Sequence, residues 1–186
     1  MSLFHLKKTA RAGVYTGLLL SLLACEEAKT VKKVDPFNGP VETIDNVEML
    51  YSEAAKLKVK LTTAKQFRYI NDDRKYPKQV NIVFYDATGQ PTTTLRSDSG
   101  RYDKAKDLYT VMGNVVVVNT LKQEKLLTPT LNWKPSTKKV YTEKRVTVIS
   151  QLTGEKLYGI GMDANQDFSQ YSIRKPTGIF NVNGGI

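Results

Sequence analysis

The chain has 186 residues, of which 28 are basic and 18 acidic, and it contains one histidine, His5, and one cysteine, Cys25. Because both lie within the first 25 positions, the rest of the chain has neither residue for a Ser-His-Asp or Cys-His catalytic site. It also lacks the preferred ligands of zinc, copper and haem, and it has no pair of cysteines for an internal disulfide. These classes of enzyme are therefore excluded, and we expect neither a metal nor a cofactor.

The N-terminal segment has the pattern of a secretory leader. Three basic residues precede an uncharged apolar run, residues 12–24, which is shorter than the about 20 residues that span a bilayer. The run ends in Leu-Leu-Ala before Cys25, a motif that resembles the lipobox of bacterial lipoproteins, in which the cysteine is acylated and the chain is cut just before it. We therefore expect residues 1–24 to be a signal peptide and Cys25 to carry a lipid anchor. An uncleaved anchor, or an ordinary signal peptide with an incidental cysteine, is the alternative.

The segment after the leader is basic and begins with a flexible tether. Without the leader, 25 basic and 18 acidic residues remain, a net charge of +7. The basic residues are scattered through strand-like segments without a basic helix, so we expect no nucleic acid partner and regard anionic lipid headgroups as the more natural counter-charge. Residues 25–40 are charged, interrupted by proline and glycine, and predict a tether.

From Val41 onward the pattern predicts short β-strands. The segment Val80–Tyr85 alternates apolar and polar residues, the segment 87–90 has turn chemistry, and a second strand follows at 92–97. Runs of β-branched residues at 115–118 and 146–149 also favour strands. The one stretch with helical character, residues 49–58, is short, and we interpret Glu53-Ala54-Ala55 within it as a turn between two strands.

A repeat underlies these strands. The segment Leu95–Val117 aligns with Leu126–Val148 at an offset of 31 residues for most equivalent positions, and a third copy begins near Leu157. A period of about 31 holds two strands with their turns, so the unit is hairpin-like and stacks on the next. Such a stack forms either a closed barrel or an open jelly roll. Turns are expected at residues 98–100, 103–107, 135–138 and 153–154.

Three motifs in this order, at residues 97–102, 113–117 and 159–168, resemble the LptC family. This family is the membrane-anchored periplasmic component of the lipopolysaccharide export machine and shares its repeat with LptA and LptD. The resemblance covers nearly all of an expected domain at residues 41–180, before a tail at 181–186. It implies an all-β fold, a twisted open antiparallel β-jelly roll built from stacked hairpin-like repeats.

The same resemblance implies a function. The domain would receive lipopolysaccharide from the inner-membrane permease and ATPase complex, hold the acyl chains in its interior, and pass them to an LptA-like bridge protein. Better-known members carry an uncleaved transmembrane helix, whereas this chain has the lipobox pattern. The expected place is therefore the periplasmic face of the bacterial inner membrane, with a lipid anchor at Cys25.

Alternation places one set of residues on a shared face that would hold the acyl chains. The same residues would form the core of any β-sandwich, and only the family resemblance favours a groove. The set consists of Ile82, Phe84, Tyr102, Val115, Val117, Leu131, Trp133, Val146 and Val148.

Edge-to-edge strand pairing is the expected mode of contact with the bridge protein. The resemblance makes the C-terminal end the docking end, and the candidate edge residues are Leu157, Ile160 and Ile173. Two other functions remain open beside the carrier. One is a structural or adaptor lipoprotein that scaffolds partners without binding lipid, and the other is a carboxylate-dependent enzyme, although no pair of acids is placed for it.

Overall fold

The computed structural model describes residues 36–177, and these residues form an antiparallel β-fold without an α-helix. The expected all-β jelly-roll class is confirmed. The strands are β1 (Glu42–Glu53), β2 (Lys56–Arg68), β3 (Arg74–Tyr76), β4 (Val80–Tyr85), β5 (Pro91–Ser97), β6 (Ser99–Asp103), β7 (Leu108–Asn119), β8 (Glu124–Lys134), β9 (Lys139–Ser150), β10 (Lys156–Asn165) and β11 (Tyr171–Thr177), with a 3-10 turn η1 (Pro135–Thr137) between β8 and β9.

The leader, Cys25, most of the tether and the tail at 181–186 lie outside the described residues. The predictions made for them therefore remain predictions.

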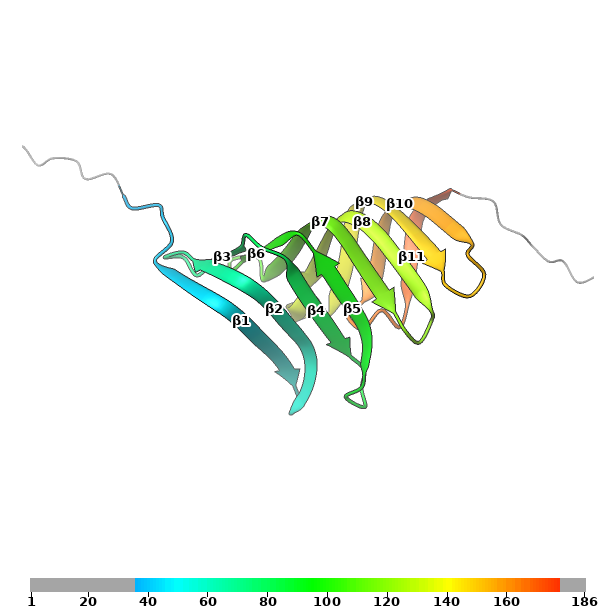
Figure 1. Cartoon of the computed structure of the whole chain (residues 1–186), viewed down its shortest axis with the longest axis horizontal. Helices are drawn as coiled ribbons and strands as arrows, with labels where there is room; N and C mark the ends of the chain where they lie inside the picture. The colour runs from blue at the N-terminus through cyan, green and yellow to red at the C-terminus, as the bar shows by residue number, and fades with distance from the viewer. Residues whose placement is uncertain (1–35, 178–186) are drawn as a thin grey trace, which may run out of the picture. The chain divides into compact units, whose positions relative to one another are not determined.

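The strands form one sheet that folds over itself (Figure 1). Neighbouring strands in sequence pair antiparallel from β7 to β11, while β5 pairs with both β4 and β7, and β1 pairs with β2. The long strands change register in their middle, so each contributes to two layers. The first layer holds β4, β5 and the adjoining halves of β7 to β10, and the second holds β3, β6 and the other halves.

Turn chemistry explains most of the connections. The predicted turn at residues 53–55 is confirmed, because β1 ends at Glu53 and both Ala54 and Ala55 have positive φ. The turn at 87–90 is closed by the Asp86 carboxylate, which accepts hydrogen bonds from the backbone N–H groups of Thr88 at 2.8 Å and Gln90 at 3.0 Å. The turns expected at 103–107, 135–138 and 153–154 also lie between paired strands.

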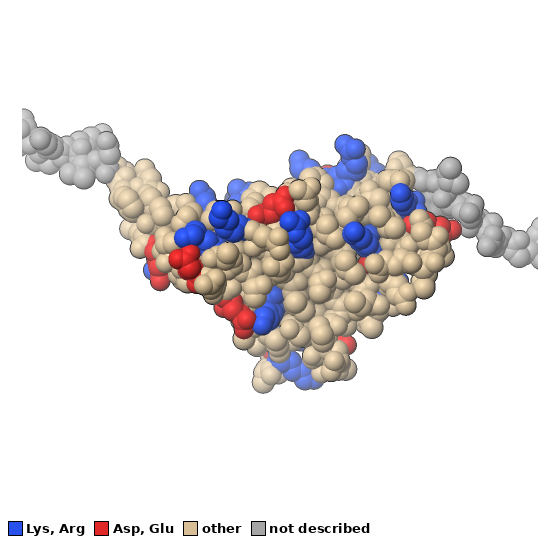
Figure 2. Space-filling model, viewed as in Figure 1, with Lys and Arg blue, Asp and Glu red and all other residues tan. Residues whose placement is uncertain are grey.

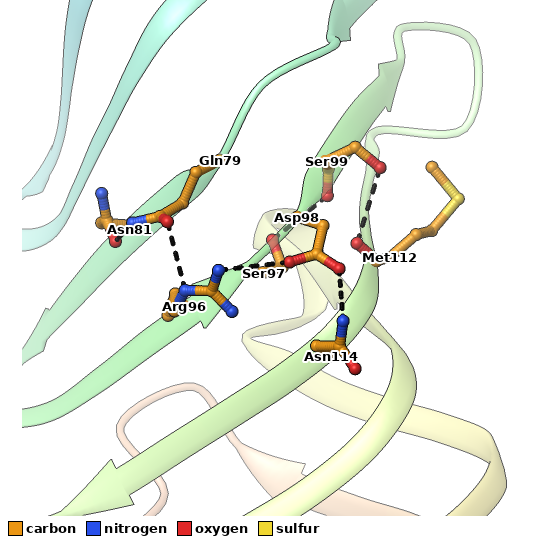
Figure 3. Close-up of polar contacts among 8 residues, drawn as sticks. All are labelled: Gln79, Asn81, Arg96, Ser97, Asp98, Ser99, Met112 and Asn114. Atoms are coloured by element: carbon orange, nitrogen blue, oxygen red, sulfur yellow. Dashed lines mark hydrogen bonds and ion pairs between the residues drawn. The ribbon is translucent and has the colours of Figure 1, made fainter.

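The turn expected at residues 98–100 is wrong. Only Asp98 separates β5 from β6, and both strands pair with β7, so the chain bends there from one layer to the other without reversing. The bend is a polar corner (Figure 3), in which Asn114 donates a hydrogen bond to the Asp98 carboxylate at 2.7 Å and Arg96 forms an ion pair with it at 3.3 Å. Gly113 has a φ of +79° and lies against Asp98.

The 31-residue offset has a structural cause at these corners. The Ser97 hydroxyl donates to the carbonyl of the residue two positions on, at 3.1 Å, and the Thr128 hydroxyl makes the equivalent bond at 3.2 Å. Each hydroxyl satisfies a carbonyl where the ladder of strand pairing is interrupted. The repeat therefore marks successive places at which the sheet turns from one layer to the other.

Each end of the sheet has a strand with one neighbour among the described residues, β1 at the N-terminal end and β11 at the C-terminal end. The expectation that Ile160 lies on an edge is wrong, because it pairs with a residue of β9 on one side and a residue of β11 on the other. Leu157 pairs with β9, and a partner on its other side would lie outside the described residues. Ile173 does lie on the edge strand β11. A bulge interrupts the pairing of β9 with β10, with a register shift around Gly161, whose φ is +78°.

Candidate functional site

The interior between the two layers is the candidate site, and it contains all nine residues predicted from alternation. Each is 9% exposed or less, from Val146 at 0% to Tyr102 at 9%. Val117 is buried, whereas the neighbouring Val116 lines a depression on the outer face, so the predicted register is confirmed. Lipid binding by these residues remains a prediction.

An apolar row crosses the first layer from strand to strand. Its members are direct partners in successive strand pairs, and eight strands spaced about 4.8 Å apart make a track of roughly 34 Å. The row consists of Met49, Leu61, Ile82, Leu95, Val117, Leu126, Val148 and Leu157. Every member is buried or half-buried, so this row is apolar along its whole length.

An aromatic row crosses the second layer in the same manner. The rings of Tyr102 and Tyr109 stack at 4.3 Å between centroids, and those of Tyr109 and Trp133 at 4.9 Å. Arg74, the partner of Tyr102 on β3, places its guanidinium 5.6 Å from the Tyr102 ring centre. Beyond Trp133 the row continues with the smaller residue Val140, so the aromatic surface belongs to the N-terminal part of the interior.

Burial changes the acidity of the tyrosines in this interior. It raises the pKa of Tyr109 and, less strongly, that of Tyr102, where the nearby carboxylate of Asp107 acts in the same direction. The Tyr102 hydroxyl donates to Asp107 at 3.2 Å. These groups stay neutral at physiological pH and act as hydrogen-bond donors.

The interior is filled by side chains. Phe168, in the loop between β10 and β11, is 4% exposed and its ring lies 5.5 Å from that of Phe84 in the opposite layer. The cavity beside it, lined by Val117, Met162 and Tyr171 among others, holds about 20 Å³. That volume accommodates about one water molecule. A lipid chain therefore requires a side chain to move.

Phe168 has a strained backbone conformation. Its φ of +57° is unfavourable for a bulky residue. Two side-chain bonds attach its loop to the first layer, from Thr93 to the Asp167 carbonyl at 3.3 Å and from Asn119 to the Phe168 carbonyl at 3.4 Å. Trp133 holds the same loop through Gln166 at 2.9 Å.

Sequence reasoning missed several residues of this interior. Phe168 lies in a loop, and Tyr76 lies in a strand of three residues, where no alternation can be recognised. Tyr109 is separated from Val115 by the corner at Gly113, which interrupts the period of two. The only signal for Tyr109 was its place in the 31-residue repeat.

Comparison with known proteins decides the family. The family described as "Lipopolysaccharide-assembly, LptC-related" matches residues 14–174. The chain belongs to the LptC family. No curated protein matches it. The chain therefore takes part in lipopolysaccharide transport at the cell envelope, in a family whose members are non-enzymatic transport components.

Within residues 36–177, no group of three or more His, Cys, Asp or Glu side chains is placed to hold a metal ion. The part of the chain that the structure describes contains no helix long and apolar enough to cross a membrane.

Proposed function

We propose that the β-domain is a lipid carrier that receives lipopolysaccharide from the inner-membrane permease and ATPase complex and passes it to an LptA-like bridge protein. The observation that supports this most is the apolar row, which joins eight strands without a polar interruption. A sandwich core needs only local contacts, whereas a carrier needs one apolar surface that continues from its entry to its exit. The acyl chains would lie against this row.

Loading would begin with displacement of Phe168. Its ring fills the space between the layers beside the 20 Å³ cavity, and its backbone is strained. An acyl chain that replaces the ring restores the lost apolar contacts and releases that strain. The loop between β10 and β11 would then move outward as the lipid enters.

In this proposal the carrier is held at the periplasmic face of the inner membrane by a lipid on Cys25. Each acyl chain contributes about 0.8 kcal/mol per buried CH₂, so two or three chains anchor a protein stably. Residues 25–40 would serve as the tether and residues 41–180 as the carrier domain. Hand-over would use the free edge of β11.

A structural adaptor that binds partners but no lipid is the second candidate, and the filled interior favours it. Mass spectrometry of lipid extracted from the full chain, purified in mild detergent, separates the two. Co-purified lipopolysaccharide is the result expected for a carrier. An empty protein that still binds the bridge protein would support the adaptor.

A further inference from the structure

Three buried polar atoms on the N-terminal strands β2 and β3 have no hydrogen-bond partner among residues 36–177. Within residues 36–177 they are the only buried side-chain nitrogen or oxygen atoms in this condition: the hydroxyl oxygens of Thr63 and Tyr76 and Nε of Arg74. All three come from β2 and β3. Buried polar groups in folded proteins are nearly always paired, so these exceptions need an explanation.

Arg74 and Tyr76 are two positions apart on β3, so their side chains leave the same face of that strand. Arg74 is the strand partner of Arg68, five positions farther along β2 than Thr63, so Thr63 is not part of this pair. The Tyr76 ring lies 3.3 Å from the position that a Cβ on Gly100 would occupy. Burial raises the pKa of Tyr76, and the neighbouring Arg74 guanidinium partly opposes that shift through its charge and a direct side-chain contact. Gly100 therefore leaves the room in which the Tyr76 ring fits.

The charge of Arg74 is not neutralised by any carboxylate of residues 36–177. Its neighbour Arg68 has two partners, Glu42 at 2.6 Å and Asp72 at 3.1 Å. The nearby Asp107 is already engaged by Tyr102 and by the backbone N–H of Ser136.

The outer surface at this end is different. Acidic and basic side chains are interspersed there (Figure 2), as in the ion pairs Lys60–Glu48 and Lys65–Asp45, both at 2.7 Å. Arg74 differs from these lysines in having no carboxylate partner among residues 36–177.

Arg74 and Tyr76 can both donate hydrogen bonds, and what the pair lacks is an acceptor with negative charge. A phosphate group offers several oxygen acceptors, and an arginine fork binds it with charge-assisted hydrogen bonds. We propose that Arg74 and Tyr76 form a binding site for the phosphate group of a phosphorylated glycolipid. This inference rests on the proposed carrier function, since it places the headgroup phosphate at the N-terminal end of the interior that holds the acyl chains.

The test measures binding of the full chain to bisphosphorylated lipid A and to the same lipid after enzymatic removal of its phosphates. Arg74→Gln removes the charge, and Tyr76→Phe removes only the hydroxyl. Arg101→Gln is the matched control, because Arg101 is the exposed neighbour of the site on β6 and its replacement changes the net charge equally. Loss of a charge-assisted hydrogen bond should weaken binding of the phosphorylated lipid by about tenfold in both site variants. Binding of the dephosphorylated lipid, and both bindings in the control, should not change.

Thermal unfolding of the lipid-free proteins supplies a second readout. Tyr76→Phe removes an unpaired buried donor, so its melting temperature should equal or exceed that of the wild type while its affinity for the phosphorylated lipid falls. A purely structural role for Tyr76 predicts that stability and affinity fall together, and that result would overturn the proposal. If Arg74→Gln does not fold, the affinity and stability of Tyr76→Phe still test the phosphate site.

Three other outcomes are distinguishable. Equal binding of both lipids by all proteins would overturn the phosphate site and leave the carrier function standing. A wild-type protein that binds neither lipid would overturn the carrier function itself. Inorganic phosphate alone should not raise the melting temperature; if it does so in the wild type but not in Tyr76→Phe, the site binds free phosphate and its assignment to a lipid headgroup is wrong.

Discussion

At the scale of single residues, Phe168 combines two features that oppose each other. Its ring is buried between the layers, which stabilises the closed interior, while its left-handed backbone is unfavourable for a bulky side chain. A residue in this state can leave the interior at a smaller cost than one in a strand. This property is what the loading step of a carrier requires.

Replacement of Phe168 by glycine tests that role. Loss of a buried Phe ring costs about 3–5 kcal/mol, and relief of the backbone strain offsets about 1 kcal/mol of this. We expect Phe168→Gly to lower the free energy of unfolding and to raise the amount of lipopolysaccharide that co-purifies. Leu121→Gly, an exposed apolar residue in the β7–β8 hairpin, should change neither. Unchanged or reduced lipid in Phe168→Gly would mean that the ring does not block the interior.

Tyr171 gives a prediction about pH. Its partial burial, followed by the charge of Glu124, raises the pKa of Tyr171 from 10.0 to about 12. Because the hydroxyl loses its proton more easily in the unfolded chain, this residue reduces stability as pH rises from about 10 to 12 and has no effect below pH 10. Urea unfolding over this pH range should show a shallower loss of stability for Tyr171→Phe than for the wild type. Identical slopes would contradict the pKa shift.

At the scale of elements, the corners determine how one sheet becomes two layers. Gly113 and Gly89 both have positive φ, +79° and +89°, but a Cβ on Gly113 would lie 2.7 Å from the Asp98 carboxylate, whereas one on Gly89 would meet nothing within 4 Å. An alanine at Gly89 therefore introduces backbone strain alone, whereas an alanine at Gly113 introduces the same strain and also disrupts the corner at Asp98.

We therefore expect Gly89→Ala to cost about 1 kcal/mol of unfolding free energy, and Gly113→Ala to cost about 1–3 kcal/mol more. Equilibrium unfolding in urea measures both. Equal losses would show that the contact with Asp98 does not hold the corner.

The edge strand β11 is the element through which the bridge protein would dock. The backbone N–H of Asn165 donates a hydrogen bond to the carbonyl of Gln170 at 3.0 Å. In an antiparallel pair, hydrogen-bonded and non-hydrogen-bonded residue pairs alternate. The backbone groups of Ser172 are therefore bonded to β10, and those of Ile173 point away from it. An incoming strand would bond to those outward groups.

Three variants test this edge. Ile173→Pro removes an outward donor and should abolish or strongly weaken binding of the bridge protein while the domain stays folded. Ile173→Ala keeps the donor and should bind nearly as the wild type does. Ser172→Pro breaks a bond within the sheet and should mainly reduce stability. Wild-type affinity in a folded Ile173→Pro would exclude β11 as the docking edge and make β1 the candidate.

At the scale of the whole molecule, the sequence predicted the parts of the fold in which local pattern and tertiary pairing agree. The strand at Val80–Tyr85 has the predicted limits because its alternation extends over its whole length. The segment at Asp98 was mistaken for a turn because Asp, Ser and Gly have turn chemistry, whereas pairing of both flanking strands with β7 makes it a bend. The short strand β3 carries too few residues for any period.

The candidate site was predictable to the same extent. Alternation identifies inward residues such as Val117, but Phe168 and the site at Arg74 depend on how loops and short strands approach the interior in three dimensions. Alternation also cannot tell a core from a groove, since both bury the same side chains. Only detection of bound lipid distinguishes a groove from a core.

The central claim is that lipopolysaccharide travels against the inner face of this sheet. A photoreactive residue introduced at position 117, and in a separate variant at the outward position 116, tests it in living cells. The account predicts crosslinks to lipopolysaccharide from position 117 and none from position 116. Crosslinks from position 116 alone, or from neither position in a folded protein that still supports transport, would contradict it.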